Sequence, residues 1–384
     1  MAKKVAILGT GIIGSEAESQ FGHAGYEIVA AVSSRTLKHA DGHVTTFQGR
    51  GNPDEIGSHL MKICEQGLDL VVSALPSAGP KVAEKELALT LPLLKMGKSV
   101  VIAGKAMLSD YFHEVAPHRP QMGINASVGG ATEILSEMRN NLRFDTGQPS
   151  VVELVLNGTL SYIQTGVWAD RPLEAVVREA VLNKFAEPGL NGQERDPFDI
   201  FEAEAEGDVP KKVRIILQEV YGRVIGRRLL PNDVRVTPLI DKDLLKHVSN
   251  ETALRQQVMW RLTASNARRK YVVRISTVDL PPQVEQGSPG SIWANIDGKV
   301  FVSGGFYHIP YGSALDMWVP NSGPGNAVHI SQGGRVRIAK ADGAGALATV
   351  GTLLKDARAL CPPLEQSAPN ELAKSLAREN VAIA

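Results

Sequence analysis

The stretch VAILGTGIIG, residues 5–14, begins as a short apolar run and ends in closely spaced glycines. Helix-forming residues follow it, and a second apolar run over residues 27–32 closes the unit. A buried strand, a tight turn and a helix in this order match the G-x-G-x-x-G pattern that binds a dinucleotide. Gly9 would permit the turn, Gly11 would let a pyrophosphate approach the backbone, and Gly14 would let helix and strand pack closely. The residues of this turn that we expect to contact the cofactor are Gly9, Gly11, Ile12, Ile13 and Gly14.

The residues after the second apolar run indicate which dinucleotide binds. A carboxylate at this position would take the ribose 2′-hydroxyl of NAD, but the chain reads SSRT over residues 33–36 and its next acid is Asp41. Hydroxyl groups and a guanidinium suit a 2′-phosphate, because arginine makes charge-assisted bidentate bonds to phosphate oxygens. We therefore expect NADP rather than NAD, bound at Ser34 and Arg35. The alternative for Arg35 is an ordinary solvated loop arginine.

Length, charge and cysteine content limit the class of protein. A chain of 384 residues is long enough for two domains with a large core. Its 41 basic and 41 acidic residues balance, so charge gives no reason to expect nucleic acid or an anionic membrane as a partner. No apolar run approaches the roughly 20 residues that span a bilayer. Cys64 and Cys361 are isolated, which is typical of free thiols in a reducing cytoplasm.

Strands alternate with helices over the first third of the chain. Apolar runs over residues 68–75 and 99–103 predict two more strands, helices are expected over 54–66 and 81–96, and a further short strand is expected over 121–127. This alternation predicts a parallel, doubly wound Rossmann sheet. The Gly- and His-rich segment between residues 39 and 53 is expected to be a polar loop.

The pattern changes from Val128 onward. Helices are expected over residues 128–142, 160–168, 173–184 and 207–221, and strands over 151–156, 271–280, 291–296, 299–303 and 315–319. We therefore predict an α/β protein with a Rossmann domain at 1–127 and an α+β substrate domain at 128–340. Residues 341–384 are expected to form a final helix, over 341–360, and a tail.

Lys105 directly follows a predicted buried strand. Ligands of open α/β sheets bind beyond the carboxyl ends of the strands. A lysine there could hold a substrate carboxylate, or exchange a proton with a reacting hydroxyl. The alternative is a solvated loop lysine. A second candidate is the acidic, proline-containing segment 184–199, which is either a binding loop or an acidic surface loop.

Asp208 and Lys212 stand four residues apart, so a helix would place them on one face. From the residues alone, Asp208 with Pro210 just behind it predicts a helix N-cap. The acidic residues just before this pair are expected to form a solvated face; they are Glu202, Glu204 and Glu206.

Several of these segments occur in the order seen in homoserine dehydrogenases, which the sequence resembles over most of residues 5–360. The matching segments are the glycine turn, AGKA at 103–106, VGG at 128–130, NGTLSYI at 157–163, AEP at 186–188, GDVPKK at 207–212, GPG at 323–325 and ADGAG at 341–345. The resemblance implies reversible NAD(P)-dependent reduction of L-aspartate 4-semialdehyde to L-homoserine. It also implies a homodimer paired through the substrate domain, which is then a dimerisation domain too, and a form without a C-terminal regulatory domain. The GPG and ADGAG segments are similar to that family's return to the cofactor domain, so the final helix is expected to return there.

The resemblance assigns roles to individual residues. Lys105 matches the family's catalytic lysine, and Asp208 with Lys212 matches its active-site pair. It also implies that the backbone of Val128 and Gly130 holds Na⁺ or K⁺. The remaining expected ligands are Glu187, Thr159 and Asp199 for the substrate, and Lys105 with Gly345 for the cofactor.

The sequence departs from the family near the substrate. Phe185 stands where a tyrosine is usual, residues 189–195 separate Glu187 from Asp196, and Glu133 replaces a proline. These changes leave open a second hypothesis, a related reductase for another small polar aldehyde, ketone or hydroxy acid. A third hypothesis is a non-catalytic NADP-binding regulatory protein, which would have no need of the lysines and acids described above.

Overall fold

The computed structural model of the chain describes residues 2–48, 51–77, 81–186, 196–263 and 268–363. The first of two sheets has the strand order β4-β3-β2-β1-β5-β6-β7. Strands β2 and β5 flank β1, and β2, β1, β5, β6 and β7 run parallel. The five parallel strands are β1 (Lys4–Leu8), β2 (Glu27–Val32), β5 (Leu70–Ser73), β6 (Ser99–Ile102) and β7 (Met122–Gly123). The predicted doubly wound parallel sheet is confirmed, with its topological switch at β1.

The far edge of this sheet is an antiparallel hairpin, where a polar loop was expected. It consists of β3 (Thr36–His39) and β4 (Val44–Thr46). The hairpin turns at Asp41 and Gly42, and Gly42 has a positive φ of 86°. Asp-Gly is a strong hairpin signal. The short strands were not predicted because the residues around this turn are mostly polar. At the opposite edge, the strand expected over residues 121–127 is limited to the two residues of β7, and a 3₁₀ turn at Asn125–Ser127 follows.

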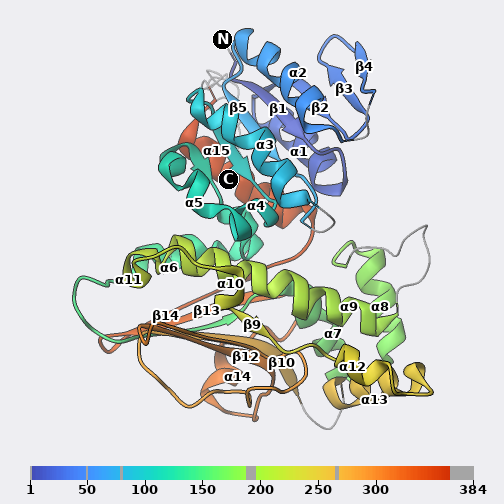
Figure 1. The fold of residues 1–384 in the computed structure, drawn as a ribbon, viewed down its shortest axis with the longest axis vertical. Helices are drawn as coiled ribbons and strands as arrows, with labels where there is room; N and C mark the ends of the chain where they lie inside the picture. The colour runs from blue at the N-terminus through green and yellow to red at the C-terminus, as the bar shows by residue number, and fades with distance from the viewer. Residues whose placement is uncertain (1, 49–50, 78–80, 187–195, 264–267, 364–384) are drawn as a thin grey trace, which may run out of the picture.

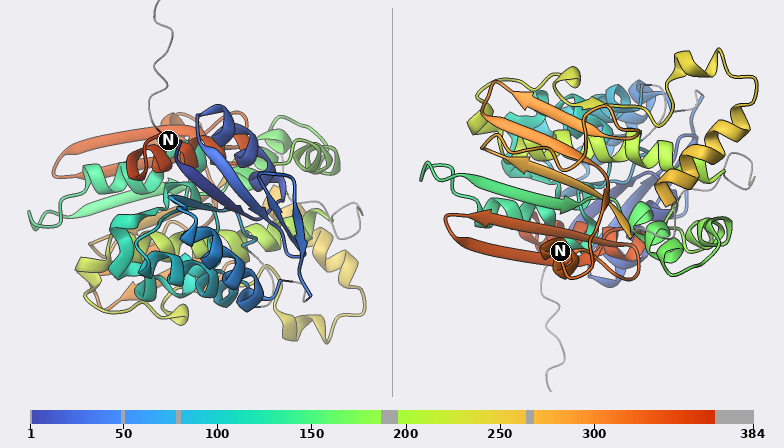
Figure 2. Two further views of the ribbon diagram at one scale, coloured as in Figure 1. Left: turned by 90° about the horizontal axis from the view of Figure 1, so that it is seen from above. Right: turned by 90° about the horizontal axis from the view of Figure 1, so that it is seen from below.

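Helices cover both faces of the first sheet (Figures 1 and 2). Successive residues of β1 point to opposite faces. Val5 and Ile7 pack with α1 (Ile12–His23) and with the C-terminal helix α15 (Ala346–Leu360). Ala6 and Leu8 belong to the core on the other face, to which α2 (Pro53–Glu65) and α3 (Val82–Lys95) contribute.

The second sheet has the order β14-β13-β8-β10-β12-β11-β9 and is antiparallel. Its strands are β8 (Ser150–Val155), β9 (Arg235–Val236), β10 (Arg269–Ser276), β11 (Ile292–Ile296), β12 (Val300–His308), β13 (Gly325–Gln332) and β14 (Arg335–Asp342). The strands expected near residues 151, 271, 291 and 299 are present as β8, β10, β11 and β12. Together the two sheets confirm the predicted α/β fold with an α+β second part.

Several predictions for the second half were wrong. The strand expected over residues 315–319 is a helix, α14 (Ala314–Trp318), which the Ser313 side chain caps. Strands β13 and β14 were not predicted, and the final helix begins at Ala346 rather than at residue 341 because residues 335–342 form β14. The helix expected from residue 128 is a 3₁₀ turn followed by α6 (Ile134–Asn141). Glu133 separates the two, because its positive φ of 49° interrupts the helix.

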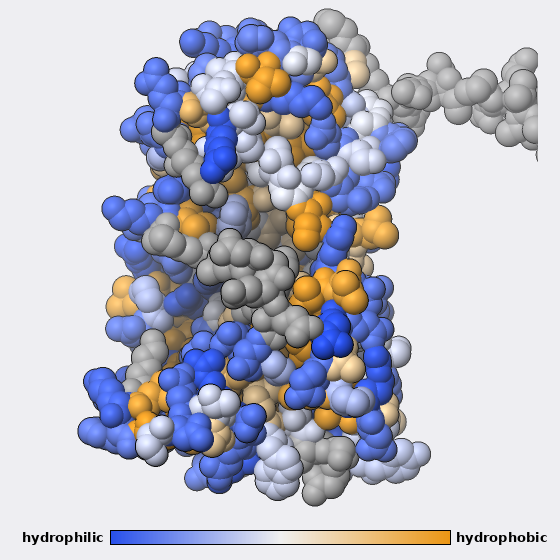
Figure 3. Space-filling model, turned by 90° about the vertical axis from the view of Figure 1, so that its right-hand side faces the viewer, coloured by the Kyte–Doolittle hydropathy of each residue, from blue (hydrophilic) through white to orange (hydrophobic). Residues whose placement is uncertain are grey.

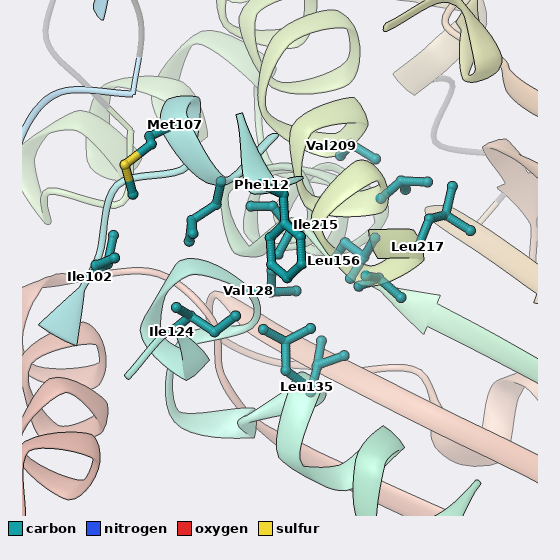
Figure 4. Close-up of a cluster of buried hydrophobic side chains, with 14 of the residues drawn as sticks. Ile102, Met107, Phe112, Ile124, Val128, Leu135, Leu156, Val209, Ile215 and Leu217 are labelled. Carbon is teal, nitrogen blue, oxygen red and sulfur yellow. The ribbon is translucent and has the colours of Figure 1, made fainter. Parts of the chain in front are cut away.

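Helix α14 covers the outer face of the second sheet, and most other helices of the second half lie between the two sheets or at one end of the second sheet (Figures 1 and 2). They are α7 (Gly158–Trp168), α8 (Leu173–Leu182), α9 (Pro197–Glu202), α10 (Val209–Glu219) and α13 (Glu251–Thr263), with the short helices α11 (Gly222–Ile225) and α12 (Lys242–Leu245). Two further short helices, α4 (Ala106–Asp110) and α5 (Phe112–Val115), belong to the first half. Buried side chains from both halves meet in one cluster (Figure 4). Met107 and Phe112 from the first half share it with Leu156 and Ile215 from the second. No helix in the described ranges is both long and apolar enough to cross a membrane.

Candidate active site

A cavity of about 780 Å³ lies at the carboxyl ends of the parallel strands, where β1, β2, β5 and β6 end. This volume is within the usual range for a cofactor or small-molecule site. Figure 3 shows one face of the molecule, which is mostly hydrophilic with hydrophobic residues scattered over it. The lining residues used below are Gly9, Gly11, Ile12, Ile13, Ser34, Gly51, Ser77, Lys85, Glu86, Lys105, Gly130, Lys212 and Gly343.

The glycine turn is built as its spacing predicted. Gly9 has a φ of 98°, and a Cβ there would lie 2.4 Å from the carbonyl oxygen of Ala74. A Cβ on Gly14 would lie 1.7 Å from the carbonyl oxygen of Gly9, so helix and turn pack in direct contact. Gly11 has open space beside it, and α1 has neither a side-chain cap nor an acid in its first turn. The start of α1 can therefore receive a phosphate.

The two residues expected to bind a 2′-phosphate differ in position. Ser34 lines the cavity, whereas Arg35 is exposed and is not among the residues that line it. The backbone N–H of Arg35 donates to the hydroxyl of Ser33, which closes the turn after β2.

Lys105 lies directly beyond β6, at the start of α4. Its backbone N–H donates to the Ser77 hydroxyl at 3.1 Å, which ties the ends of β5 and β6 together. Its Nζ lies 3.5 Å from Oδ1 of Asp208, which comes from the second half of the chain. Lysine and aspartate thus meet at the boundary between the two halves.

Asp208 is paired with two lysines. Its Oδ2 lies 2.6 Å from Nζ of Lys212, which also donates to the carbonyl oxygen of Leu156 at 2.7 Å. Burial opposes ionisation of Asp208, but the ammonium groups of Lys212 and Lys105 outweigh it and hold the pKa of Asp208 at about 2. The carboxylate therefore stays charged at any physiological pH.

The N-cap predicted for Asp208 was wrong. Its backbone is helical, with φ of −76° and ψ of −50°, and its side chain caps nothing. Helix α9 runs through a π-helical segment, Ala203–Asp208, directly into α10. An aspartate with a proline two residues later looks like a helix start, but here the wider π-turn carries the helix through Pro210.

Glu204 and Asn157 belong to the same group and were not predicted as site residues. The Asn157 side-chain amide donates to Oε2 of Glu204 at 2.5 Å and to Oδ2 of Asp208 at 2.9 Å. Its Oδ1 accepts from the backbone N–H of Leu160 and so caps α7. Burial, together with the charge of Asp208, raises the pKa of Glu204 to about 7.

The solvated face expected for the acidic run was therefore wrong for two of its members. Glu204 is in the site, and Glu206 accepts from the backbone N–H of Leu239 at 2.6 Å. The π-turn shifts these side chains away from the positions that a regular helix would give them. The NGT sequence at residues 157–159 could have predicted a site role for Asn157. Lys211, also missed, donates to the Ser77 carbonyl oxygen at 2.5 Å and so bridges the two halves.

The expected substrate residues do not all gather at the cavity. Thr159 donates its hydroxyl to the carbonyl oxygen of Phe185 at 2.6 Å. Asp199 pairs with Arg255 of α13 at 2.8 Å and is not among the residues that line the cavity. Glu187 and the 189–195 insertion lie outside the described residues.

The expected cation site and Gly345 lie next to the cavity. Gly130 lines it, and the Gly130 carbonyl oxygen already accepts from the backbone N–H of Glu133 and the hydroxyl of Thr352. In the ranges that the structure describes, no three His, Cys, Asp or Glu side chains are grouped to hold a metal ion. Gly345, with a φ of 102°, begins α15, whereas Gly343 is the residue of this segment that lines the cavity.

No protein-family model matches the chain, and no curated protein matches its sequence. Solved structures match its fold over nearly its whole length. A protein of unknown function from Candida auris has a TM-score of 0.64 at 18% identity, covering 94% of this chain and 98% of that one. Homoserine dehydrogenase from Thermoplasma acidophilum has a TM-score of 0.57 at 16% identity, covering 93% and 98%. A hyperthermophilic archaeal homoserine dehydrogenase in complex with NADPH has 0.56 at 15%, covering 94% and 98%.

The chain has the fold of the homoserine dehydrogenases. At these identities the likeness concerns the fold alone. The reaction has to be argued from the side chains beside the dinucleotide-type turn. Lys105 and Lys212 line the cavity there, and Asp208 pairs with both.

Proposed function

We propose that the chain is an NADP-dependent oxidoreductase that interconverts L-homoserine and L-aspartate 4-semialdehyde by hydride transfer. The observation that carries this proposal is the pairing of Lys105 and Lys212 with Asp208 at the wall of the dinucleotide-type cavity. The fold likeness to solved homoserine dehydrogenases, one of them with NADPH, supports it.

The cavity fits a dinucleotide. The open space at Gly11 and the uncapped start of α1 would hold the pyrophosphate, and Ser34 lies where the adenosine ribose is bound in such folds. When bound, the nicotinamide supplies or accepts the hydride. The part of the cavity wall near Lys105 and Lys212 would then bind the carbonyl or hydroxyl oxygen of the substrate.

The two lysines have different tasks in this proposal. Lys212 is 7% exposed and already donates to Asp208 and Leu156. It therefore acts as a fixed positive charge that stabilises the negative charge developing on the substrate oxygen. Lys105 is 21% exposed, and its ion pair with Asp208 is the longer one. Lys105 therefore gives a proton to the carbonyl oxygen during reduction and takes one from the hydroxyl during oxidation. Asp208 holds both ammonium groups in place.

The substrate ammonium group needs acceptors near this oxygen. The Asn157 side-chain amide donates to both Glu204 and Asp208 and so holds the two carboxyl groups together. Glu187 is the glutamate that the sequence resemblance assigns to this task. We propose that these carboxylates bind the ammonium group and so orient the carbonyl toward the cofactor.

A second candidate function has its own observation. Phe185 lacks the hydroxyl usual in the family, and its ring packs edge-on against Tyr162 with 5.1 Å between centroids. The missing hydroxyl favours a reductase for another small polar aldehyde, ketone or hydroxy acid. A non-catalytic NADP-binding regulatory protein has less support, because it gives the lysines and Asp208 no use.

The experiment follows absorbance of the reduced nicotinamide with purified protein, L-homoserine, and NADP or NAD in parallel. We expect turnover with NADP, and a loss of roughly 100-fold or more in kcat for Lys105→Ala. Lys95→Ala, an exposed lysine at the end of α3, is the matched control and should keep full activity. Turnover only on another aldehyde or hydroxy acid, still dependent on Lys105, would establish the second candidate. Tight NADPH binding without any Lys105-dependent reaction would overturn both.

We also propose that the protein is a homodimer paired through the second sheet. Strand β14 ends the strand order of that sheet, and its Val336 and Ile338 side chains are 61% and 42% exposed. An edge strand with exposed apolar side chains is suited to pairing with another chain. The location in the cytoplasm and the Na⁺ or K⁺ at Val128 and Gly130 stay predictions from the sequence.

A further inference from the structure

The ribose end of the cavity brings together three residues from separate elements. Ser34 follows β2, Gly51 precedes α2, and Lys85 lies in the first turn of α3. All three line the cavity. The backbone N–H of Gly51 donates to the carbonyl oxygen of Ser34 at 2.6 Å, which fixes the two loops against each other.

The Lys85 side chain extends toward Ser34 and Gly51. The point where a Cβ would stand on Gly51 is 3.9 Å from Nζ of Lys85 and 3.9 Å from Cβ of Ser34. Because Gly51 has no side chain, the space between the ammonium group and the serine stays open. A single phosphate group placed there would contact both residues.

The charges around this space favour an anion. Lys85 lines the cavity, and its Nζ forms no hydrogen bond or ion pair with another described residue. Glu86 is the one acid among the described residues that line the cavity, and its carboxylate is turned toward Ser73 and Met107 instead. Arg35, the cation expected from the sequence, does not line the cavity.

We propose that Lys85 binds the 2′-phosphate of NADP, and that the preference for NADP over NAD depends on Lys85 more than on Arg35. The inference rests on the proposed use of a dinucleotide but not on any particular substrate. A phosphate monoester carries close to two negative charges near neutral pH, which a lysine ammonium can bind as a point charge. The uncharged 2′-hydroxyl of NAD would form no comparable charge-assisted contact with Lys85.

The test is calorimetric binding of NADPH and NADH to the full chain, with no substrate present. Lys85→Ala should weaken NADPH binding about 10- to 100-fold, as expected for a lost charge-assisted contact, and leave NADH binding unchanged. Lys85→Arg should keep the preference for NADPH. Raising the salt concentration should weaken NADPH binding less in Lys85→Ala than in the wild type.

Two variants serve as comparisons. Lys95→Ala removes an exposed lysine from the far end of the same helix and should bind both dinucleotides normally. Arg35→Ala should cost less NADPH affinity than Lys85→Ala. The inference is overturned if Lys85→Ala binds NADPH as tightly as the wild type, if it loses NADPH and NADH equally, or if Arg35→Ala has the larger effect.

The failure of this inference differs from the failure of the proposed function. A wild-type chain that binds NADPH through Lys85 but does not oxidise homoserine would keep the inference and reject the substrate. A wild-type chain that binds neither dinucleotide would reject both. A chain that turns over homoserine with equal affinity for the two cofactors would reject only the inference.

Discussion

Glu86 is a fully buried carboxyl at the inner wall of the cavity. Its Oε1 accepts from the Ser73 hydroxyl at 2.9 Å, and its Oε2 accepts from the backbone N–H of Met107 at 3.3 Å. A Cβ on Gly104 would lie 2.5 Å from Oε1, so the carboxyl packs directly on the turn that presents Lys105. Burial raises the pKa of Glu86 from 4.5 to about 7, against the smaller opposing effects of these bonds and of Lys105.

This pKa predicts how stability depends on pH. Between pH 4.5 and about 7 the folded chain holds more protons at Glu86 than the unfolded chain does, so the free energy of unfolding falls as pH rises. Glu86→Gln should remove this dependence. Urea unfolding at pH 5 and pH 8 should show the wild type losing up to about 3 kcal/mol more than the variant over this interval. Glu65→Gln, at an exposed glutamate of α2, is the control, and an unchanged slope in Glu86→Gln would contradict the prediction.

At the residue scale, local position after a buried strand was enough to locate Lys105, whereas the family resemblance was needed to assign Asp208 and Lys212 to the site. Lys105 follows a buried strand and Lys212 stands four residues after Asp208, and the structure brings all three together. Glu204 and Lys85 could not be found in this way. Glu204 reaches the site because a π-turn changes the helical register, and Lys85 lines the cavity from a helix whose spacing shows only a solvated lysine.

At the element scale, short apolar runs predicted the strands of the first sheet correctly, but they were not reliable in the second half of the chain. The parallel strands are continuous apolar runs bounded by turns, and each was predicted. Strand β14 reads RVRIAKAD, so charged residues interrupt it and no buried face appears in the pattern. The run at residues 315–319 is apolar but short, and periodicity cannot tell a short helix from a strand.

The edge strand β14 leads to a prediction about assembly. If the chain pairs through this edge, replacing Val336 and Ile338 with lysine should place four charges in the contact and shift the protein toward the 41.2 kDa monomer in light scattering. Val44→Lys is the matched control, because Val44 is 50% exposed on β4, the edge strand of the first sheet. A wild type that is already monomeric, or a double variant that stays dimeric, would refute the proposed interface.

At the scale of the whole molecule, the two ends of the described chain are joined in one core. Helix α15 packs against α1 and β6. Asp356 of α15 accepts from the backbone and the side chain of Asn125 at 2.9 and 2.6 Å, and the Tyr26 hydroxyl donates to the carbonyl oxygen of Cys361. No local pattern shows which sheet a C-terminal helix covers, so this return was expected only from the family resemblance.

This joining predicts that α15 contributes to the stability of the first sheet. Leu353 is fully buried against that sheet, whereas Leu347 on the same helix is 70% exposed. Leu353→Ala should lower the free energy of unfolding by about 2–5 kcal/mol, and Leu347→Ala by no more than about 0.5 kcal/mol. Equal effects in urea unfolding would contradict the packing described here.

NADPH affinity adds a second measurement, because Gly343 in the cavity wall lies just before α15. If Leu353→Ala also weakens NADPH binding while Leu347→Ala does not, the C-terminal helix couples the stability of the first sheet to the shape of the cofactor cavity.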